Sequence, residues 1–140
     1  MGEQDNVQIV RELLASFQCG DLRALLDLCS QDVVIQHPIP KEILPFAGIS
    51  HGKREAKRFC VGMAETFNLN PFQPSEFIAQ GNNVAVIIFE RYTNRATGRT
   101  VDSEYVHIYT LEYGKVVRIR IYQDTVSILA TMPNPIFLDP

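Results

Sequence analysis

The sequence lacks several features that would place it in a functional class at once. Its three cysteines, Cys19, Cys29 and Cys60, include no close-spaced pair of the kind that binds zinc. Each lies on the apolar side of an expected helix, which predicts three buried thiols in a reducing compartment. No apolar run approaches the length of a membrane span, and the opening residues MGEQDNVQ are acidic and polar, unlike a signal peptide. We therefore expect a cytoplasmic protein with no membrane partner.

Charge of one sign is not in excess either. Lys and Arg total 13 against 16 Asp and Glu, and the net charge of −3 gives no electrostatic reason to expect nucleic acid as a partner. The chain has no glycine-rich phosphate loop, no metal triad among its three scattered histidines and no serine–histidine–aspartate order. We therefore expect a site that uses no cofactor and no metal.

What the sequence does contain is the pattern of one α+β domain over residues 1–140. The chain is long enough to bury a core, and 46% of its residues are apolar while 21% are charged. Apolar residues at helical spacing predict a first helix that ends at Gly20, a second that Asp21 caps, and a third that follows Gly52.

The second half of the sequence predicts an antiparallel sheet. Its runs are rich in β-branched and aromatic residues and are separated by short turns that contain glycine, which is typical of hairpins. Three helices on one face of a curved antiparallel sheet give a cone-shaped α+β roll, whose open end is a natural place for a small molecule. The expected segments are strands at 33–37, 76–80, 83–94, 100–113 and 116–124, a helix at 125–131 capped by Asp124, a proline-rich loop at 38–50 that could cover the pocket mouth, and an apolar tail at 132–140.

Alternation along the strands predicts which side chains face the inside of the cone. In the strand 100–113 the uncharged, aromatic-rich set lies inside. The strand 83–94 is apolar on both faces at its start, so alternation alone does not orient it. With Phe89 placed inside, Arg91 and Thr93 lie inside with it. The outer face then carries an apolar patch of the kind that binds a partner, made of Val84, Val86, Ile88, Tyr92, Val106 and Ile108.

This placement selects the candidate site residues. His37, Arg91 and His107 are the candidates for catalysis, because imidazoles titrate near neutral pH and a guanidinium can hold an oxyanion. The side chains expected to contact the substrate are Ile35, Phe89, Thr93, Tyr105, Tyr109, Ile121 and Gln123.

Each candidate catalytic residue also has a second interpretation. His37 can be a general base or a buried neutral histidine bonded to a backbone carbonyl. His107 lies between two tyrosines and can be a core histidine bonded to one of them. Arg91 needs a partner or a ligand if it is buried, and otherwise reaches solvent beside an acidic neighbour.

Short motifs that follow one another at suitable spacing point to a known family. They are Gly20-Asp21, Asp32-Val33-Val34, His51-Gly52-Lys53-Arg54-Glu55-Ala56, Gly114-Lys115-Val116 and Tyr122-Gln123-Asp124. With them the chain resembles the SnoaL-like branch of the nuclear-transport-factor-two-like superfamily, which includes ketosteroid isomerases, limonene-epoxide hydrolases and polyketide cyclases. The resemblance covers almost the whole chain. It implies a cystatin-like cone fold and a homodimer formed through the outer sheet face, but no particular reaction.

Limonene-epoxide hydrolase gives the nearest comparison within that superfamily. In this resemblance His37 stands where that enzyme has its water-orienting Asn, and Arg91 matches its Arg, but Thr93 and Ile121 replace its two Asp residues. That mechanism needs one carboxylate as base and a protonated one as acid, so we do not expect an epoxide hydrolase of this type. The Asp base and Tyr/Asp oxyanion hole of ketosteroid isomerase have no clear match either.

Two functions stay open at this point. The first is a cofactor-independent isomerase, cyclase or hydrolase acting on an apolar, carbonyl-bearing or cyclic compound, in which His37 or His107 moves the proton and Arg91 holds the oxyanion. The second is a non-catalytic ligand-binding or dimerisation module. The missing carboxylates favour the second function. The arginine and two histidines at expected inward positions favour the first, which we take as the prediction.

Overall fold

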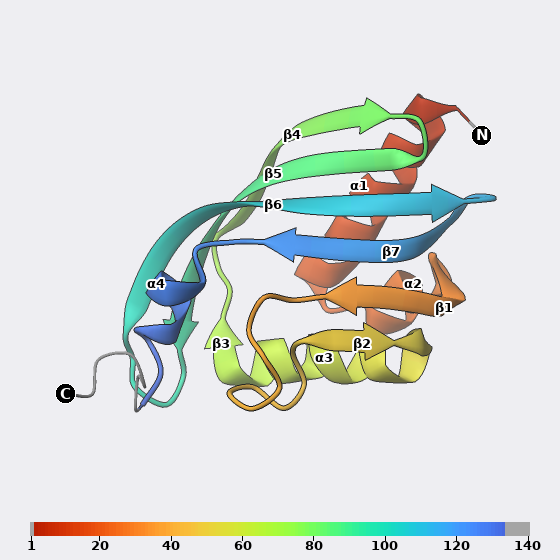
Figure 1. Ribbon diagram of the computed structural model, residues 1–140. Helices are drawn as coiled ribbons and strands as arrows, with labels where there is room; N and C mark the ends of the chain where they lie inside the picture. Colours follow the sequence, from red (N-terminus) through yellow and green to blue (C-terminus); the bar gives the residue numbers. More distant parts are fainter. Residues whose placement is uncertain (1, 134–140) are drawn as a thin grey trace.

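Four helices and seven strands make up residues 2–133, the part of the chain that the computed structural model describes (Figure 1). The helices are α1 (Glu3–Cys19), α2 (Leu22–Asp27), α3 (Gly52–Thr66) and α4 (Thr125–Leu129). The strands are β1 (Cys29–Gln36), β2 (Ile49–His51), β3 (Phe67–Asn68), β4 (Phe72–Gln80), β5 (Asn83–Asn94), β6 (Thr100–Glu112) and β7 (Lys115–Tyr122). Most of the apolar tail, residues 134–140, lies outside the described residues.

The first helices end and begin where local chemistry predicts. α1 ends at Gly20, whose φ of 75° lies in the left-handed region that glycine adopts without strain. The Asp21 side chain accepts a hydrogen bond from the backbone N–H of Ala24 at 3.0 Å and so caps α2. Cys19 is exposed, because the last turn of α1 has left the core, so the prediction of three buried thiols is wrong at this position. The other two cysteines are buried as predicted.

The sheet contains pairings that the sequence did not predict, because β2 and β3 lie outside the expected strands and because β1 and β7 run parallel. Its order is β2-β1-β7-β6-β5-β3, with β4 also paired to β5. Most neighbours are antiparallel as expected, but β1 and β7 are parallel, with Ile35 opposite Ile119. The long connection between these two strands, through α3 and the hairpins, gives the chain the length that a parallel pair requires.

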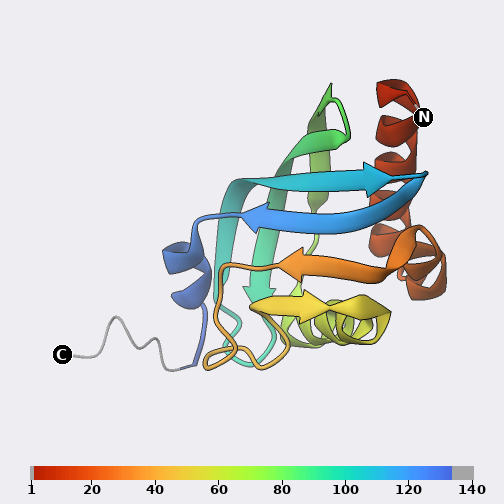
Figure 2. The same ribbon diagram turned by 45° about the vertical axis from the view of Figure 1, so that its right-hand side comes forward.

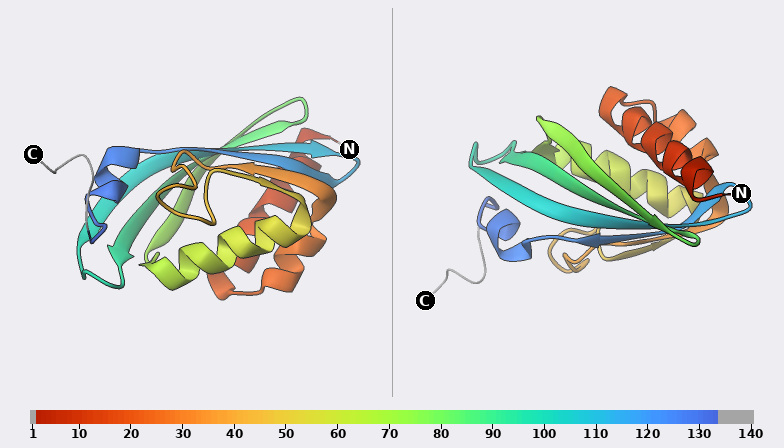
Figure 3. Two further views of the ribbon diagram at one scale, coloured as in Figure 1. Left: turned by 60° about the horizontal axis from the view of Figure 1, so that its bottom comes forward. Right: turned by 90° about the horizontal axis from the view of Figure 1, so that it is seen from above.

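The sheet is curled, and α1, α2 and α3 cover its concave side (Figures 2 and 3). These three helices leave the convex side of β5, β6 and β7 uncovered, while α4 lies beside the curled end of β6. The predicted α+β roll is therefore confirmed. The Asp124 side chain accepts a hydrogen bond from the backbone N–H of Ser127 at 3.2 Å, so it caps α4. None of the helices in the described residues is both long and apolar enough to cross a membrane.

Alternation along β5 is the reverse of the predicted one. Phe89, Arg91 and Thr93 point to the convex side, and their predicted inward placement is wrong. The pairing with β6 explains this, because Ile88 stands opposite Tyr105, and opposite residues share a face of the sheet. A shift of one residue moves every side chain of a strand to the other face. The buried side of β5 consists of Val84, Val86, Ile88, Glu90, Tyr92 and Asn94.

The proline-rich loop between β1 and β2 packs against α3. Ile39, Leu44 and Ala47 are buried in the core. The Phe46 ring lies on Gly62 of α3, where a Cβ atom would be 2.2 Å from the ring Cγ. Residues 38–48 do not line the cavity between the helices and the concave side of the sheet, so the suggestion that they cover its mouth is not supported.

We expect Gly62→Ala to destabilise the protein by about 1–3 kcal/mol, because the new methyl group forces the Phe46 ring to move. The higher helix propensity of alanine offsets roughly 0.5–1 kcal/mol of that loss. Urea denaturation of Gly62→Ala, Phe46→Ala and the double variant measures the coupling, with Lys57→Ala on the exposed side of α3 as control. If Gly62→Ala lowered the free energy of unfolding equally in the wild type and in Phe46→Ala, the proposed contact between Gly62 and the Phe46 ring would be contradicted.

Candidate functional site

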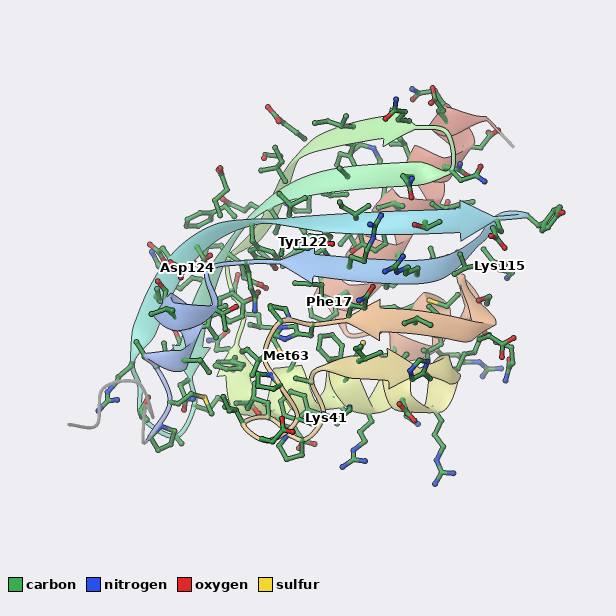
Figure 4. The ribbon with its side chains drawn as sticks, viewed as in Figure 1. Phe17, Lys41, Met63, Lys115, Tyr122 and Asp124 are labelled. Atoms are coloured by element: carbon green, nitrogen blue, oxygen red, sulfur yellow. The ribbon has the colours of Figure 1, made fainter. Side chains whose placement is uncertain are left out.

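A cavity lies between the concave side of the sheet and the helices. Its wall takes side chains from α1, α2, α3, β1, β4, β5, β6 and β7. Phe17 from α1 and Met63 from α3 contribute to it and lie near the middle of the molecule (Figure 4). The space open to the centre of a water molecule is about 60 Å³, enough for a few waters at roughly 10–15 Å³ each. The wall is mostly apolar, and its polar members are His37, Glu90, Tyr92, Tyr105, His107 and Tyr109.

Glu90 is a carboxyl group inside this apolar wall. It is 1% exposed, its Oε1 accepts a hydrogen bond from the Tyr105 hydroxyl, and its Oε2 has no partner among the described residues. Burial raises the pKa of Glu90 from 4.5 to about 8, although hydrogen bonds from Tyr105 and Tyr92 oppose the shift. The side chain is therefore mainly protonated at neutral pH. In that state it can donate a proton or a hydrogen bond.

His107 and Tyr109 form a second polar pair in the wall. The His107 Nδ1 and the Tyr109 hydroxyl are 2.7 Å apart. This bond occupies Nδ1, so Nε2 is the ring nitrogen that remains for a ligand. Burial, and to a smaller degree the nearby His37, lowers the pKa of His107 to about 3. The imidazole is therefore neutral across the physiological range. Burial also raises the pKa of Tyr109 well above its ordinary value, so its hydroxyl keeps its proton.

His37 and Tyr92 are joined through the side chain of Gln123. The parallel pairing places Gln36 opposite Arg120, so the ends of β1 and β7 meet at one edge. The Gln123 Nε2 lies 3.1 Å from His37 Nε2, and the Gln123 Oε1 lies 3.0 Å from the Tyr92 hydroxyl, which donates to it in this orientation of the amide. Burial lowers the pKa of His37 to about 4, so this imidazole is also neutral at pH 7.

The structure brings together most of the residues that the sequence predicted for the site. Ile35, Tyr105 and Ile121 line the cavity together with both predicted histidines and Tyr109. Gln123 is not part of the wall but holds two side chains that are. Their roles in binding or catalysis stay predictions.

Three predicted site residues lie outside the cavity. Phe89, Arg91 and Thr93 occupy the convex face of β5, for the reason of register given above. The Arg91 side chain is 46% exposed, and its Nε lies 2.7 Å from Oδ1 of Asp102 on β6. Thr93 bonds to Thr100 across the same pair of strands at 2.9 Å. Arg91 therefore belongs to a solvent-exposed ion pair and cannot hold an oxyanion in the cavity.

Glu90 is the site residue that sequence reasoning missed. It occurs in the stretch Ile87-Ile88-Phe89-Glu90-Arg91-Tyr92, where either the Phe89 side or the Ile88 side could be buried. The signal was the alternation that continues from Val84 through Ile88 to Glu90. This alternation places the Glu90 carboxyl group on the buried side. The sequence alone does not show that a carboxyl group is buried there; the pairing of β5 with β6 does.

The site does not offer a metal-binding set. Within residues 2–133, no cluster of three or more His, Cys, Asp or Glu side chains could hold a metal ion. The polar groups of the wall are neutral near pH 7, and the wall contains no lysine or arginine. Such a cavity suits a neutral ligand with an apolar body and a polar end.

Comparisons with known proteins agree with this architecture. The SnoaL-like domain family model matches residues 10–119. An NTF2-like protein from Burkholderia xenovorans LB400 is 31% identical, with 94% of this chain and 98% of that one covered and a TM-score of 0.84. TerC, co-crystallised with polyporic acid, is 25% identical over 91% of this chain and 97% of its own, with a TM-score of 0.81. No curated protein sequence matches the chain.

A more distant structure shows the same fold. A protein described as a SnoaL-like polyketide cyclase from Jannaschia sp. CCS1 is 20% identical, with 94% of this chain and 95% of that one covered and a TM-score of 0.79. The resemblance drawn from the sequence motifs is thus confirmed. The chain belongs to the SnoaL-like domain family, and its fold is the NTF2-like cone.

Proposed function

We propose that the protein is a cofactor-independent enzyme of the isomerase or cyclase type, which moves a proton on a neutral, carbonyl-bearing ring compound held in the cavity. The observation that carries this proposal is Glu90, a protonated carboxyl group with one unpartnered oxygen in an apolar wall. An acid kept neutral at pH 7 by burial can donate to a carbonyl oxygen as charge develops on it.

Glu90 acts as the acid in this proposal. Its proton passes to the carbonyl oxygen of the substrate while the neighbouring carbon loses a proton to the base, so that the carbonyl group becomes an enol. The carboxylate left behind is stabilised by the Tyr105 hydroxyl that bonds Oε1. This fills the role that the sequence had given to Arg91. A pKa of about 8 lies near the operating pH, which suits a general acid.

His107 acts as the base. When its Nδ1–H donates to Tyr109, the lone pair on Nε2 can accept a proton from the carbon next to the carbonyl. The imidazolium formed in this way appears together with the Glu90 carboxylate, so the cavity keeps a net charge of zero during the step. Opposite charges formed together inside a low-dielectric site stabilise each other.

Two comparisons support a ring compound as the substrate. One structural relative is described as a SnoaL-like polyketide cyclase, and another was crystallised with polyporic acid. The apolar wall of the cavity here, which includes Phe17, Phe59 and Phe72, is suited to an apolar ring.

We also propose a homodimer formed through the convex face of the sheet. Of the patch predicted from sequence, only Val106 and Ile108 lie on this face, since the four residues from β5 are buried inside. Pairing across β4, β5 and β6 aligns Ile78, Ala85 and Ile108 in one row. The apolar convex patch of Ile78, Ile87, Phe89, Val106, Ile108 and Tyr122 supports the proposal.

The enzyme proposal predicts both binding and exchange. We expect neutral cyclic ketones or lactones to raise the melting temperature of the wild type, because binding stabilises only the folded state. Arg91→Leu keeps this shift, and Glu90→Leu loses it.

A ligand that binds takes up deuterium next to its carbonyl in heavy water, followed by NMR, and Glu90→Gln slows this uptake by roughly 10²-fold or more. Binding without any exchange would favour the non-catalytic module.

The raised pKa of Glu90 makes stability fall as pH rises. Between its unfolded pKa of 4.5 and its folded pKa of about 8, the folded state holds more protons than the unfolded chain. The stabilisation is complete below the lower value and is lost by the upper one, at about 1.4 kcal/mol per pH unit. From about pH 7 to about pH 8, where the histidines are neutral, urea denaturation should show a loss in wild type that is absent in Glu90→Gln. If the free energy of unfolding changed with pH equally in the wild type and in Glu90→Gln, Glu90 would not be a buried acid with a raised pKa.

Sedimentation tests the homodimer. At micromolar concentration we expect the wild type to sediment with the mass of two chains, and Ile108→Glu to shift it toward one chain because a buried carboxylate opposes the contact. Tyr113→Ser is the control, since Tyr113 is fully exposed at the β6–β7 turn. A wild type that sediments as a monomer contradicts the proposal.

A further inference from the structure

The Gln123 amide joins two side chains whose protons have defined places. It lies between His37 Nε2, at 3.1 Å, and the Tyr92 hydroxyl, at 3.0 Å. An amide offers an oxygen that only accepts and a nitrogen that only donates, and a half turn of the group exchanges them. The two neighbours therefore decide which end faces which.

The backbone of the proline-rich loop fixes the tautomer of His37. The backbone N–H of Ile39 donates to Nδ1 of His37 at 3.2 Å. Nδ1 therefore carries a lone pair and no proton. A neutral imidazole has one N–H, so the proton of His37 is on Nε2.

An Nε2–H group on His37 requires an acceptor from Gln123. The amide group must then be turned by a half turn from its orientation in the structure, where Nε2 faces His37 and Oε1 faces the Tyr92 hydroxyl. After that turn its oxygen faces His37 and its NH₂ faces the Tyr92 oxygen. With the opposite orientation, either two N–H groups would point at each other or both nitrogens of His37 would lack a proton, which leaves an imidazolate. Each alternative buries an unsatisfied donor or an unpaired charge and is costly.

The same orientation determines where the Tyr92 hydroxyl hydrogen points. Its oxygen accepts from the Gln123 NH₂, so its hydrogen is free to bond elsewhere. Glu90 precedes Tyr92 at the neighbouring inward position of β5, both side chains line the cavity, and a hydrogen bond from Tyr92 is among the influences that lower the pKa of Glu90. The bonds then run in one direction, from Ile39 through His37, Gln123 and Tyr92 to Glu90, and bonds aligned in this way polarise one another.

We infer that Gln123 is a positioning residue, which accepts a hydrogen bond from His37 Nε2–H and turns the Tyr92 hydroxyl toward Glu90. Gln123 does not touch the cavity, and an amide does not relay protons readily, so its contribution is orientation. His37 is thereby a hydrogen-bond donor within the scaffold, which leaves His107 as the base. The importance of this arrangement for catalysis rests on the proposed function, whereas the hydrogen-bond directions do not.

Long-range ¹H–¹⁵N NMR of the histidine rings, at neutral pH and without ligand, tests the first step. We expect His37 in the Nε2–H form, with the ¹⁵N shift of Nδ1 in the range of an unprotonated nitrogen. Finding the proton of His37 on Nδ1 would overturn the inference. The same spectrum reports His107 independently, where the proposed function requires the Nδ1–H form. The two hypotheses can therefore fail separately.

The direction of the Tyr92 hydroxyl is tested by following the Glu90 carboxyl ¹³C signal through a pH titration. If Tyr92 donates to Glu90, Tyr92→Phe raises the titration midpoint, because the carboxylate loses a donor. Tyr105→Phe is the positive control, since the Tyr105 hydroxyl bonds Oε1 of Glu90 directly. An unchanged midpoint in Tyr92→Phe, with a raised midpoint in Tyr105→Phe, would overturn the inference.

The role of Gln123 itself is tested with Gln123→Leu. We expect the Glu90 midpoint to rise, by less than in Tyr92→Phe, because the hydroxyl is no longer held in one orientation. Gln36→Leu is the matched control, since the Gln36 amide bonds Arg118 at 2.8 Å on the exposed side of the sheet. A Gln123→Leu midpoint equal to that of the wild type and of Gln36→Leu would show that Gln123 does not orient Tyr92.

Discussion

The exclusion of water from one carboxyl group is the constraint on which the candidate site depends. An ionised Glu90 would have to leave water for an apolar wall, and that transfer is so unfavourable that the side chain keeps its proton instead. Burial also keeps the two histidines of the wall neutral, because it lowers their pKa values and so disfavours the charged imidazolium form. The cavity is therefore polar without being charged, which favours neutral ligands.

The sheet topology brings these groups together from distant parts of the sequence. His37 follows β1 and Gln123 follows β7, and the two strands are parallel, so their C-terminal ends meet at the same edge. β5 and β6 are antiparallel and supply the carboxyl group and the tyrosines. The curl of the sheet and the helical layer then close the space between them (Figure 3).

Alternation along β5 and β6 places a neutral carboxyl group on one face of the sheet and an ion pair on the other. On the concave side Glu90 is protonated and bonded to Tyr105. On the convex side the next residue, Arg91, pairs with Asp102 in solvent. The Asp102 carboxyl keeps a pKa below its ordinary value because Arg91 bonds it. The two carboxyl groups on opposite faces of β5 and β6, Glu90 and Asp102, are thus in opposite protonation states, because only one face excludes water.

The sequence by itself determined the family and the main elements, but not the short strands β2 and β3. Gly20, Asp21 and Asp124 are local signals whose effects act within a few residues, so the helix boundaries that they set were predicted correctly. Only the tertiary structure decided the orientation of β5, because its first residues are apolar on both faces and the choice depends on the register with β6. The buried state of Glu90, the parallel pairing of β1 with β7 and the hydrogen bonds of Gln123 depend likewise on contacts between residues far apart in the chain.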